Sequence, residues 1–138
     1  MRSSMSWISA GNRFRARSRD FALLTAMLDL KWSPGEKKIA RAAFDAALSR
    51  EGSDIRGRVE AMLRASTDPA EIWRVRDYLN DKAREFDQKY DFRYSVLIGV
   101  FAQLLAEGWL NFEELAGLRS EKLDLLRDAS ARRKRSHV

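Results

Sequence analysis

The 138-residue chain has no cysteine and a single histidine, His137, one residue from its end. The lack of cysteine excludes disulfides, thiolate nucleophiles and cysteine zinc sites. One histidine supplies too few imidazole groups for histidine acid–base catalysis or for most transition-metal sites. Only two prolines interrupt a composition rich in alanine, leucine, arginine and acids, which favours helices. The composition therefore favours a binding or regulatory protein over an enzyme.

Glycine-rich phosphate loops and long apolar runs are also missing. The longest run without a charge, Tyr94 to Ala106, is shorter than the ~20 residues that cross a bilayer, and the N-terminus does not resemble a signal peptide. Helical metal sites add an acid-x-x-His motif to their paired acids, and the acid pairs of this chain lack it: Asp77/Asp81, Asp87/Asp91 and Glu113/Glu114. We expect a cytoplasmic protein with no cofactor, no metal and no membrane partner.

The net charge of +6 lies in the two ends of the chain. Residues 1–31 and residues 127–138 each carry +4, which leaves −2 for residues 32–126. A nucleic-acid-binding domain would carry its basic stripe on the folded body. Nucleic acid is therefore the least favoured of the three kinds of partner that we consider. We expect a folded domain over 32–126, preceded by a basic N-terminal extension over 1–31 and followed by a frayed basic tail over 127–138. The extension is expected to be disordered, or translation starts at Met27 and residues 1–26 are not part of the protein.

Capping signals and helical periodicity predict an all-α fold. Ser33 before Pro34 and Glu36 forms a capping box ahead of an apolar face; a stop or kink is expected at 51–53, or one bent helix that continues beyond it. A second start at 67–71 predicts a helix from Pro69 to about Lys89. Further helices are expected over 94–107, with Gly108 as the C-cap, over 111–117 and from Ser120. The predicted architecture is a long amphipathic N-terminal arm followed by a compact cluster from about residue 69.

Two of these helices carry specific expectations about packing. The helix over 69–89 should bury the stripe Ile72, Val75, Leu79, Ala83 and Phe86, with Glu85 and Lys89 paired on its exposed side. The helix over 94–107 is apolar on every side, so it should be covered by its own domain and also by a partner. Pairing of long helices about a two-fold axis would supply that cover, so a homodimer is expected.

Trp73, Asp77, Asn80 and Arg84 lie along one line of the predicted 69–89 helix, off its apolar stripe. An aromatic ring beside acid, amide and guanidinium groups is typical of an interaction hot spot. A half-buried tryptophan with solvated neighbours explains the spacing equally well.

The stretch around these residues resembles the fluorescence recovery protein family of cyanobacteria. The matching residues are Trp73, Asp77, Leu79, Lys82, Glu85, Asp87, Lys89-Tyr90-Asp91, Arg93, Ser95-Val96, Val100-Phe101-Ala102-Gln103-Leu104-Leu105, Glu107-Gly108 and Glu113-Glu114-Leu115. The pattern keeps its spacing through two helices and the turn between them, so the resemblance is specific over about residues 68–125.

The resemblance implies a small, non-enzymatic, all-helical homodimer. Such proteins bind the photoactivated orange carotenoid protein, chiefly its C-terminal domain, hasten its return to the resting state and so end photoprotective quenching. Trp73 and Asp77 match the positions of dimer-interface and activity residues. The candidate interface for the dimer or the partner is Trp73, Arg76, Asp77, Asn80, Arg84, Tyr90 and Arg93.

Three positions depart from the family pattern and support an alternative. The family's activity-linked arginine is Ala83 here, with Arg84 one place later; its histidine is Arg76; an aromatic exposed in its head region is Gly99. The alternative is a helical dimeric interaction or scaffold protein of the same fold that acts on a different partner in a bacterium without phycobilisomes.

Overall fold

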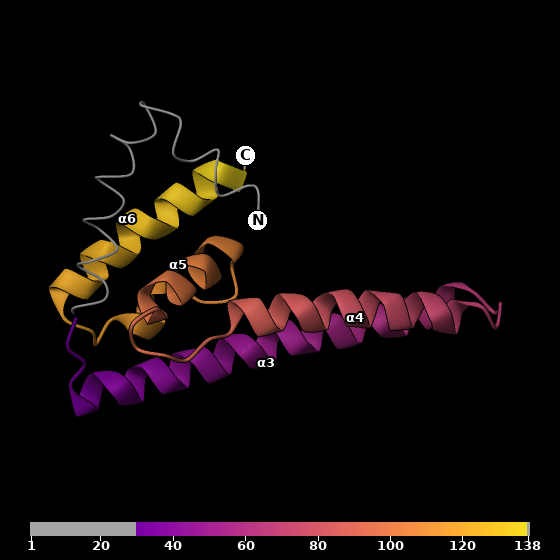
Figure 1. The fold of residues 1–138 in the computed structure, drawn as a ribbon, viewed down its shortest axis with the longest axis horizontal. Helices are drawn as coiled ribbons and strands as arrows, with labels where there is room; N and C mark the ends of the chain where they lie inside the picture. The colour runs from indigo at the N-terminus through magenta and orange to yellow at the C-terminus, as the bar shows by residue number, and fades with distance from the viewer. Residues whose placement is uncertain (1–29, 138) are drawn as a thin grey trace, which may run out of the picture. The chain divides into compact units, whose positions relative to one another are not determined.

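The computed structural model describes residues 30–137, and the compact unit that begins at Trp32 contains the helices (Figure 1). They are α3 (Pro34–Ala65), α4 (Glu71–Lys89), α5 (Leu97–Glu107), the short 3-10 helix η2 (Phe112–Leu115) and α6 (Ser120–His137). Residues 30–137 contain no strand, which confirms the all-helical class. The expected N-terminal extension lies outside the described residues apart from its last two, and the proposed divisions at 31/32 and 126/127 stay predictions.

Helix α3 begins where the capping signal predicts. Ser33 Oγ accepts the backbone N–H of Glu36 at 3.2 Å, and Glu36 Oε1 accepts that of Ser33 at 3.0 Å. The stop expected at 51–53 is absent, and one helix continues to Ala65, as the alternative interpretation had it. Gly52 costs the helix only ~1 kcal/mol in propensity, while its neighbour Glu51 is buried and held by contacts described below.

Helix α4 begins two residues later than the sequence predicts. The segment before it is a turn, in which Asp68 Oδ1 accepts the Ala70 N–H at 3.0 Å and the Asp68 carbonyl accepts the Glu71 N–H at 2.9 Å. Ala70 takes the N-cap position and makes no side-chain cap. Asp68 thus satisfies backbone donors through a turn rather than through a capping box.

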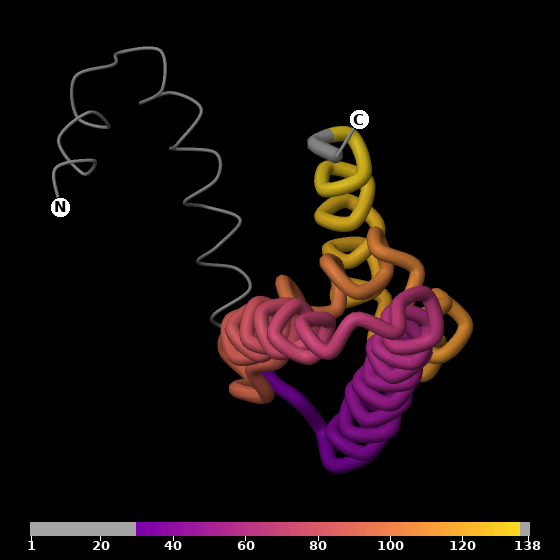
Figure 2. The backbone as a smooth tube through the Cα atoms, turned by 90° about the vertical axis from the view of Figure 1, so that its right-hand side faces the viewer, coloured from indigo at the N-terminus to yellow at the C-terminus, as the bar shows by residue number. Residues whose placement is uncertain are grey.

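Helices α3 and α4 form a hairpin, whereas α5 packs with α6; these two helices, with η2 between them in the chain, are called here the head. Helix α4 packs on α3, α5 packs mainly on α6, and η2 meets α3. Figure 2 shows that α3 and α4 separate from each other away from the turn that joins them. The predicted compact cluster therefore starts after α4, near residue 97 rather than residue 69.

The core of the head is α5, of which seven residues are buried. Leu97, Phe101 and Leu104 are 0% exposed, as is Leu126 on α6 opposite them. The helix ends at Gly108, whose φ of 88° is a left-handed conformation that favours glycine. Because the chain itself buries α5, the argument that this helix needs a partner to cover it is wrong.

Helix α6 extends further than expected. It continues to His137, so most of the segment expected to fray as a basic tail is helical. Arg133, Lys134 and Arg135 are exposed in its last turns, where cations interact favourably with the helix dipole.

Candidate partner interface

Five of the seven residues selected from the sequence lie on exposed positions of α4. They are Trp73, Arg76, Asp77, Asn80 and Arg84, called here the α4 face. Trp73 is 58% exposed, an unusual position for the residue type that buries the largest surface. Arg76 donates to Asp77 Oδ1 at 2.9 and 3.1 Å, and its guanidinium carbon lies 5.3 Å from the centre of the Trp73 ring. The tryptophan is therefore presented to solvent beside an ion pair rather than folded into a core.

The apolar stripe predicted for this helix is largely exposed as well. Of its five members only Val75 is buried, while Ile72 is 55% and Leu79 is 41% exposed. The prediction that this stripe forms core is wrong, because among the helices of residues 30–137 the main neighbour of α4 is α3 alone. Leu63 of α3 is also exposed. Large apolar side chains left open in this way mark interaction surfaces.

The other two candidates lie in the connection after α4, away from the α4 face. Tyr90 is half-buried and its hydroxyl donates to Glu51 Oε1 at 2.8 Å; burial and this bond to a carboxylate raise the pKa of the phenol. Arg93 donates to both oxygens of Asp91, at 3.0 and 2.6 Å, and lowers the pKa of that carboxyl. Their roles at an interface stay predictions, as do those of the α4 face.

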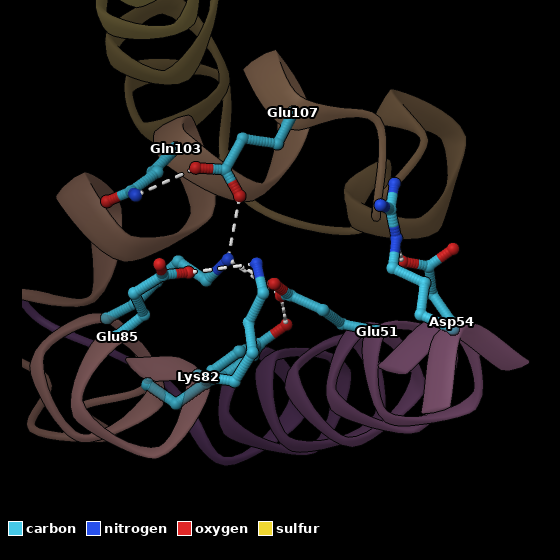
Figure 3. A network of polar contacts seen from close by, with 9 residues as sticks. Glu51, Asp54, Lys82, Glu85, Gln103 and Glu107 are labelled. Atoms are coloured by element: carbon cyan, nitrogen blue, oxygen red, sulfur yellow. Dashed lines mark hydrogen bonds and ion pairs between the residues drawn. The ribbon is translucent and has the colours of Figure 1, made fainter. Parts of the chain in front are cut away.

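A buried ionic network joins three helices where the hairpin meets the head (Figure 3), and sequence reasoning missed it. Lys89 donates to Glu51 Oε2 at 2.8 Å and to Glu107 Oε1 at 2.7 Å, and Gln103 donates to Glu107 Oε2 at 2.8 Å. The Lys89 side chain is 7% exposed and that of Glu51 is 6% exposed. We call these four residues, together with Tyr90, the junction network.

The prediction that Glu85 pairs with Lys89 on the solvent side is therefore wrong. Glu85 accepts from Lys82 at 3.1 Å instead, within α4. The available signal was the resemblance itself, whose matching residues include Lys89, Tyr90, Gln103 and Glu107. Glu51 gave no such signal, because its neighbours Gly52 and Ser53 suggested a helix stop.

A second buried ion pair connects the start of α3 with α6. Lys122 is 0% exposed, and its Nζ lies 3.1 Å from both carboxylate oxygens of Glu36. Burial alone would raise the pKa of Glu36, but hydrogen bonds from the backbone of Ser33 and Arg119 and the Lys122 ammonium lower it to about 2. Glu36, the second member of the capping box, thus also joins the start of α3 to α6.

An open groove of about 940 Å³ lies beside the junction network, between α3, α4 and the end of α5. Acids and bases alternate on its walls, so it offers no single charge to a ligand. Among residues 30–137 no group of three or more potential ligand side chains is placed to hold a metal ion. None of the described helices has the length and hydropathy that crossing a bilayer requires.

A family model described as the photoprotection regulator fluorescence recovery protein matches residues 32–128. The chain belongs to the fluorescence recovery protein family. The fluorescence recovery protein of Synechocystis sp. (strain ATCC 27184 / PCC 6803 / Kazusa) is 42% identical over 91 residues, which are 66% of this chain and 84% of that protein. The resemblance seen in the sequence is confirmed.

Solved structures of fluorescence recovery proteins have the same fold. The protein from Fremyella diplosiphon matches with a TM-score of 0.68 and 39% identity, over 73% of this chain and 99% of that chain. The protein from Synechocystis sp. PCC 6803 matches with a TM-score of 0.69 and 38% identity, over the same shares. The fluorescence recovery protein family is a family of photoprotection regulators, and its match contains the α4 face and the junction network.

Proposed function

We propose that this chain binds the photoactivated orange carotenoid protein through that protein's C-terminal domain and accelerates its return to the resting state. Its action is non-enzymatic: binding that favours the resting conformation, or the transition state leading to it, speeds relaxation without covalent chemistry. The cytoplasm is the expected location.

The observation that carries this proposal is the exposed α4 face in a member of a photoprotection-regulator family. Trp73 is 58% exposed beside the Arg76–Asp77 pair. Interaction hot spots are enriched in tryptophan and arginine surrounded by polar groups. These features support the α4 face as the contact surface for the partner, at the positions where the family resemblance implies one.

We further propose that the working form is a homodimer. Leu63, Ile72 and Leu79 are each more than two-fifths exposed, and a second copy paired about a two-fold axis would cover them. Light scattering should then give twice the 15.9 kDa chain mass at micromolar concentration. A folded monomer at that concentration would refute the dimer.

The departures at two positions support the alternative, an interaction or scaffold protein with a different partner. Ala83 replaces the arginine of the family pattern, and the neighbouring Arg84 is already paired with Asp81. Gly99 has no side chain at the position where the family pattern has an exposed aromatic, although a Cβ built there would meet nothing within 4 Å. This part of α5 therefore offers no aromatic side chain to a partner. A carotenoid-protein gene beside the gene for this chain would favour the first function; its absence would favour the alternative.

The direct test follows the red-to-orange decay of a light-activated orange carotenoid protein in the dark, with and without the purified chain. Wild-type protein should accelerate the decay, and Trp73→Ala and Asp77→Leu should lose the effect. Truncating a hot-spot residue costs about 2 kcal/mol or more, which lowers the affinity roughly 30-fold. Asp45→Leu is the matched control, because Asp45 is an exposed acid of α3 in a helical ion pair with Arg41.

Acceleration by wild type and by Asp45→Leu, lost in the two α4 variants, would support the proposal. No acceleration by a folded wild-type protein would refute it and favour the alternative. Equal loss in all variants would show that the α4 face has no special part in binding.

A further inference from the structure

Helix α4 is held on the rest of the chain by very little buried surface. Of its nineteen residues only Val75 and Lys89 are buried. Its large apolar side chains Ile72 and Leu79 are exposed, so they contribute little to its packing within the chain. Within one chain, the helix that presents the α4 face therefore depends on a small number of contacts for its orientation.

Lys89, the last residue of α4, provides the most connected of these contacts. Its ammonium group lies 2.7–2.8 Å from carboxylate oxygens of Glu51 on α3 and of Glu107 at the end of α5. Figure 3 shows these two acids approaching from different helices. Tyr90 and Gln103 donate further hydrogen bonds to the same two carboxylates, at 2.8 Å each. One ammonium thus fixes three helices relative to one another.

Helix α3 does not depend on this network for its own place on the head. Glu36 is bound to Lys122 of α6 at 3.1 Å, and Arg50 donates to Glu114 of η2 at 2.8 and 2.6 Å. Loss of the Lys89 contacts would therefore release α4 in particular, rather than the whole hairpin.

We propose that Lys89 is a positioning residue that fixes the α4 face relative to the head. Its functional consequence rests on the proposed function. A partner that binds Trp73 and Asp77 also contacts the head, and it can contact both only when α4 keeps the orientation relative to the head that the Lys89 contacts maintain. The charge matters as well as the volume, because two nearby carboxylates repel each other when no ammonium lies between them.

Two variants and a control separate positioning from folding. Lys89→Met leaves the buried Glu51 and the partly exposed Glu107 without their shared ammonium, so it risks unfolding. The triple variant Lys89→Met, Glu51→Gln, Glu107→Gln is neutral throughout and keeps acceptors for Tyr90 and Gln103, so it should fold. Arg74→Met is the matched control, because Arg74 is exposed on the same helix and forms its ion pair with Glu71 of that helix.

The first measurement uses the chain alone. Because the chain contains no cysteine, spin labels can be placed uniquely at Ala70→Cys, at the start of α4, and at Ala116→Cys, after η2; both positions are exposed. Pulsed electron resonance then gives the distance distribution between the labels, with excess unlabelled chain added to dilute contacts between copies. The triple variant should broaden or shift this distribution, and Arg74→Met should leave it unchanged. An unchanged distribution in a folded triple variant would overturn the proposal.

The second measurement uses the decay assay with increasing amounts of each protein. Mutations in a coupling network change binding by roughly twofold to thirtyfold, so the half-saturating concentration of the triple variant should rise by that factor. Its far-ultraviolet spectrum and its mass by light scattering should match those of the wild type. An unchanged half-saturating concentration beside a broadened distance distribution would overturn the role in regulation. If the wild type itself does not accelerate the decay, the proposed function fails, and the distance measurement still decides the positioning role.

Discussion

The substitution Glu36→Gln tests the buried ion pair between the start of α3 and α6. Glu36 is 3% exposed and accepts the backbone N–H of Ser33 at 3.0 Å, that of Arg119 at 2.9 Å and the Lys122 ammonium at 3.1 Å. Glutamine keeps the size of the side chain and one acceptor oxygen. It removes the charge that these donors surround, and it replaces the other acceptor oxygen by an NH2 group, so one of the two backbone N–H groups also loses its partner.

The magnitude follows from the pKa of Glu36. Burial favours the neutral acid, but the hydrogen bonds and the ammonium outweigh it and lower the pKa from 4.5 to about 2. At 1.36 kcal/mol per pH unit, this corresponds to about 3 kcal/mol of folding free energy at neutral pH. For a small domain with a total of 5–15 kcal/mol, Glu36→Gln should therefore shift the urea midpoint clearly.

The pH dependence has a definite sign. A carboxyl whose pKa is lower in the folded state stabilises the fold fully above its unfolded pKa of 4.5, and loses this effect as the pH falls toward about 2. At pH 3 about 2 kcal/mol of the stabilisation should be lost. The difference between wild type and Glu36→Gln should thus shrink from about 3 kcal/mol at pH 7 to about 1 kcal/mol at pH 3.

Urea unfolding followed by circular dichroism at both pH values, at one fixed protein concentration, measures this difference. Glu60→Gln is the control, because Glu60 is 49% exposed in a helical pair with Arg56, and such pairs contribute less than about 1 kcal/mol. A Glu36→Gln effect that is equally large at pH 3 and pH 7 would refute the electrostatic reasoning and point to packing instead.

Three further substitutions test the local packing and pairing of the fold by urea unfolding. Gly99→Ala should stabilise the chain by about 0.5–1 kcal/mol, because α5 has room for the methyl group and alanine favours the helix; a destabilised variant would contradict this. Gly117→Ala should cost about 0.5–1.5 kcal/mol, because its Cβ would overlap Cδ1 of Ile39 and the half-buried isoleucine side chain would have to leave its preferred rotamer. The cost should fall when Ile39→Val removes that atom, and equal costs in both backgrounds would rule out the overlap. Arg50→Ala should lower stability through its lost pair with Glu114, by an amount that 1 M salt reduces; a salt-independent effect would argue against the pair.

Helix boundaries set by local chemistry could be predicted well. The Ser33–Glu36 capping box and the Gly108 C-cap lie where the sequence predicts them, because each depends on backbone groups within a few residues of the side chain. The predicted helix stop near Glu51 was wrong because that turn of α3 depends on a distant residue. A contact with Lys89, 38 residues away, stabilises it.

The candidate interface was partly predictable. The line of Trp73, Asp77, Asn80 and Arg84 follows from helix spacing, and the structure exposes all four on α4. The same periodicity placed Ile72 and Leu79 in the core, where they do not lie. Amphipathic spacing shows which face of a helix is apolar, but it does not show whether the same chain or another one covers that face.

The sequence by itself therefore determined the helical class, the caps, the lack of cysteine and histidine chemistry and the family resemblance, all of which depend on composition and on neighbours close in the chain. Only the tertiary structure decided that Lys89 and Lys122 are buried in ion pairs, that the chain itself covers α5, and that the apolar face of α4 remains open. These features depend on residues between 18 and 86 positions apart. Such contacts form only when helices pack, so no pattern within one helix contains them.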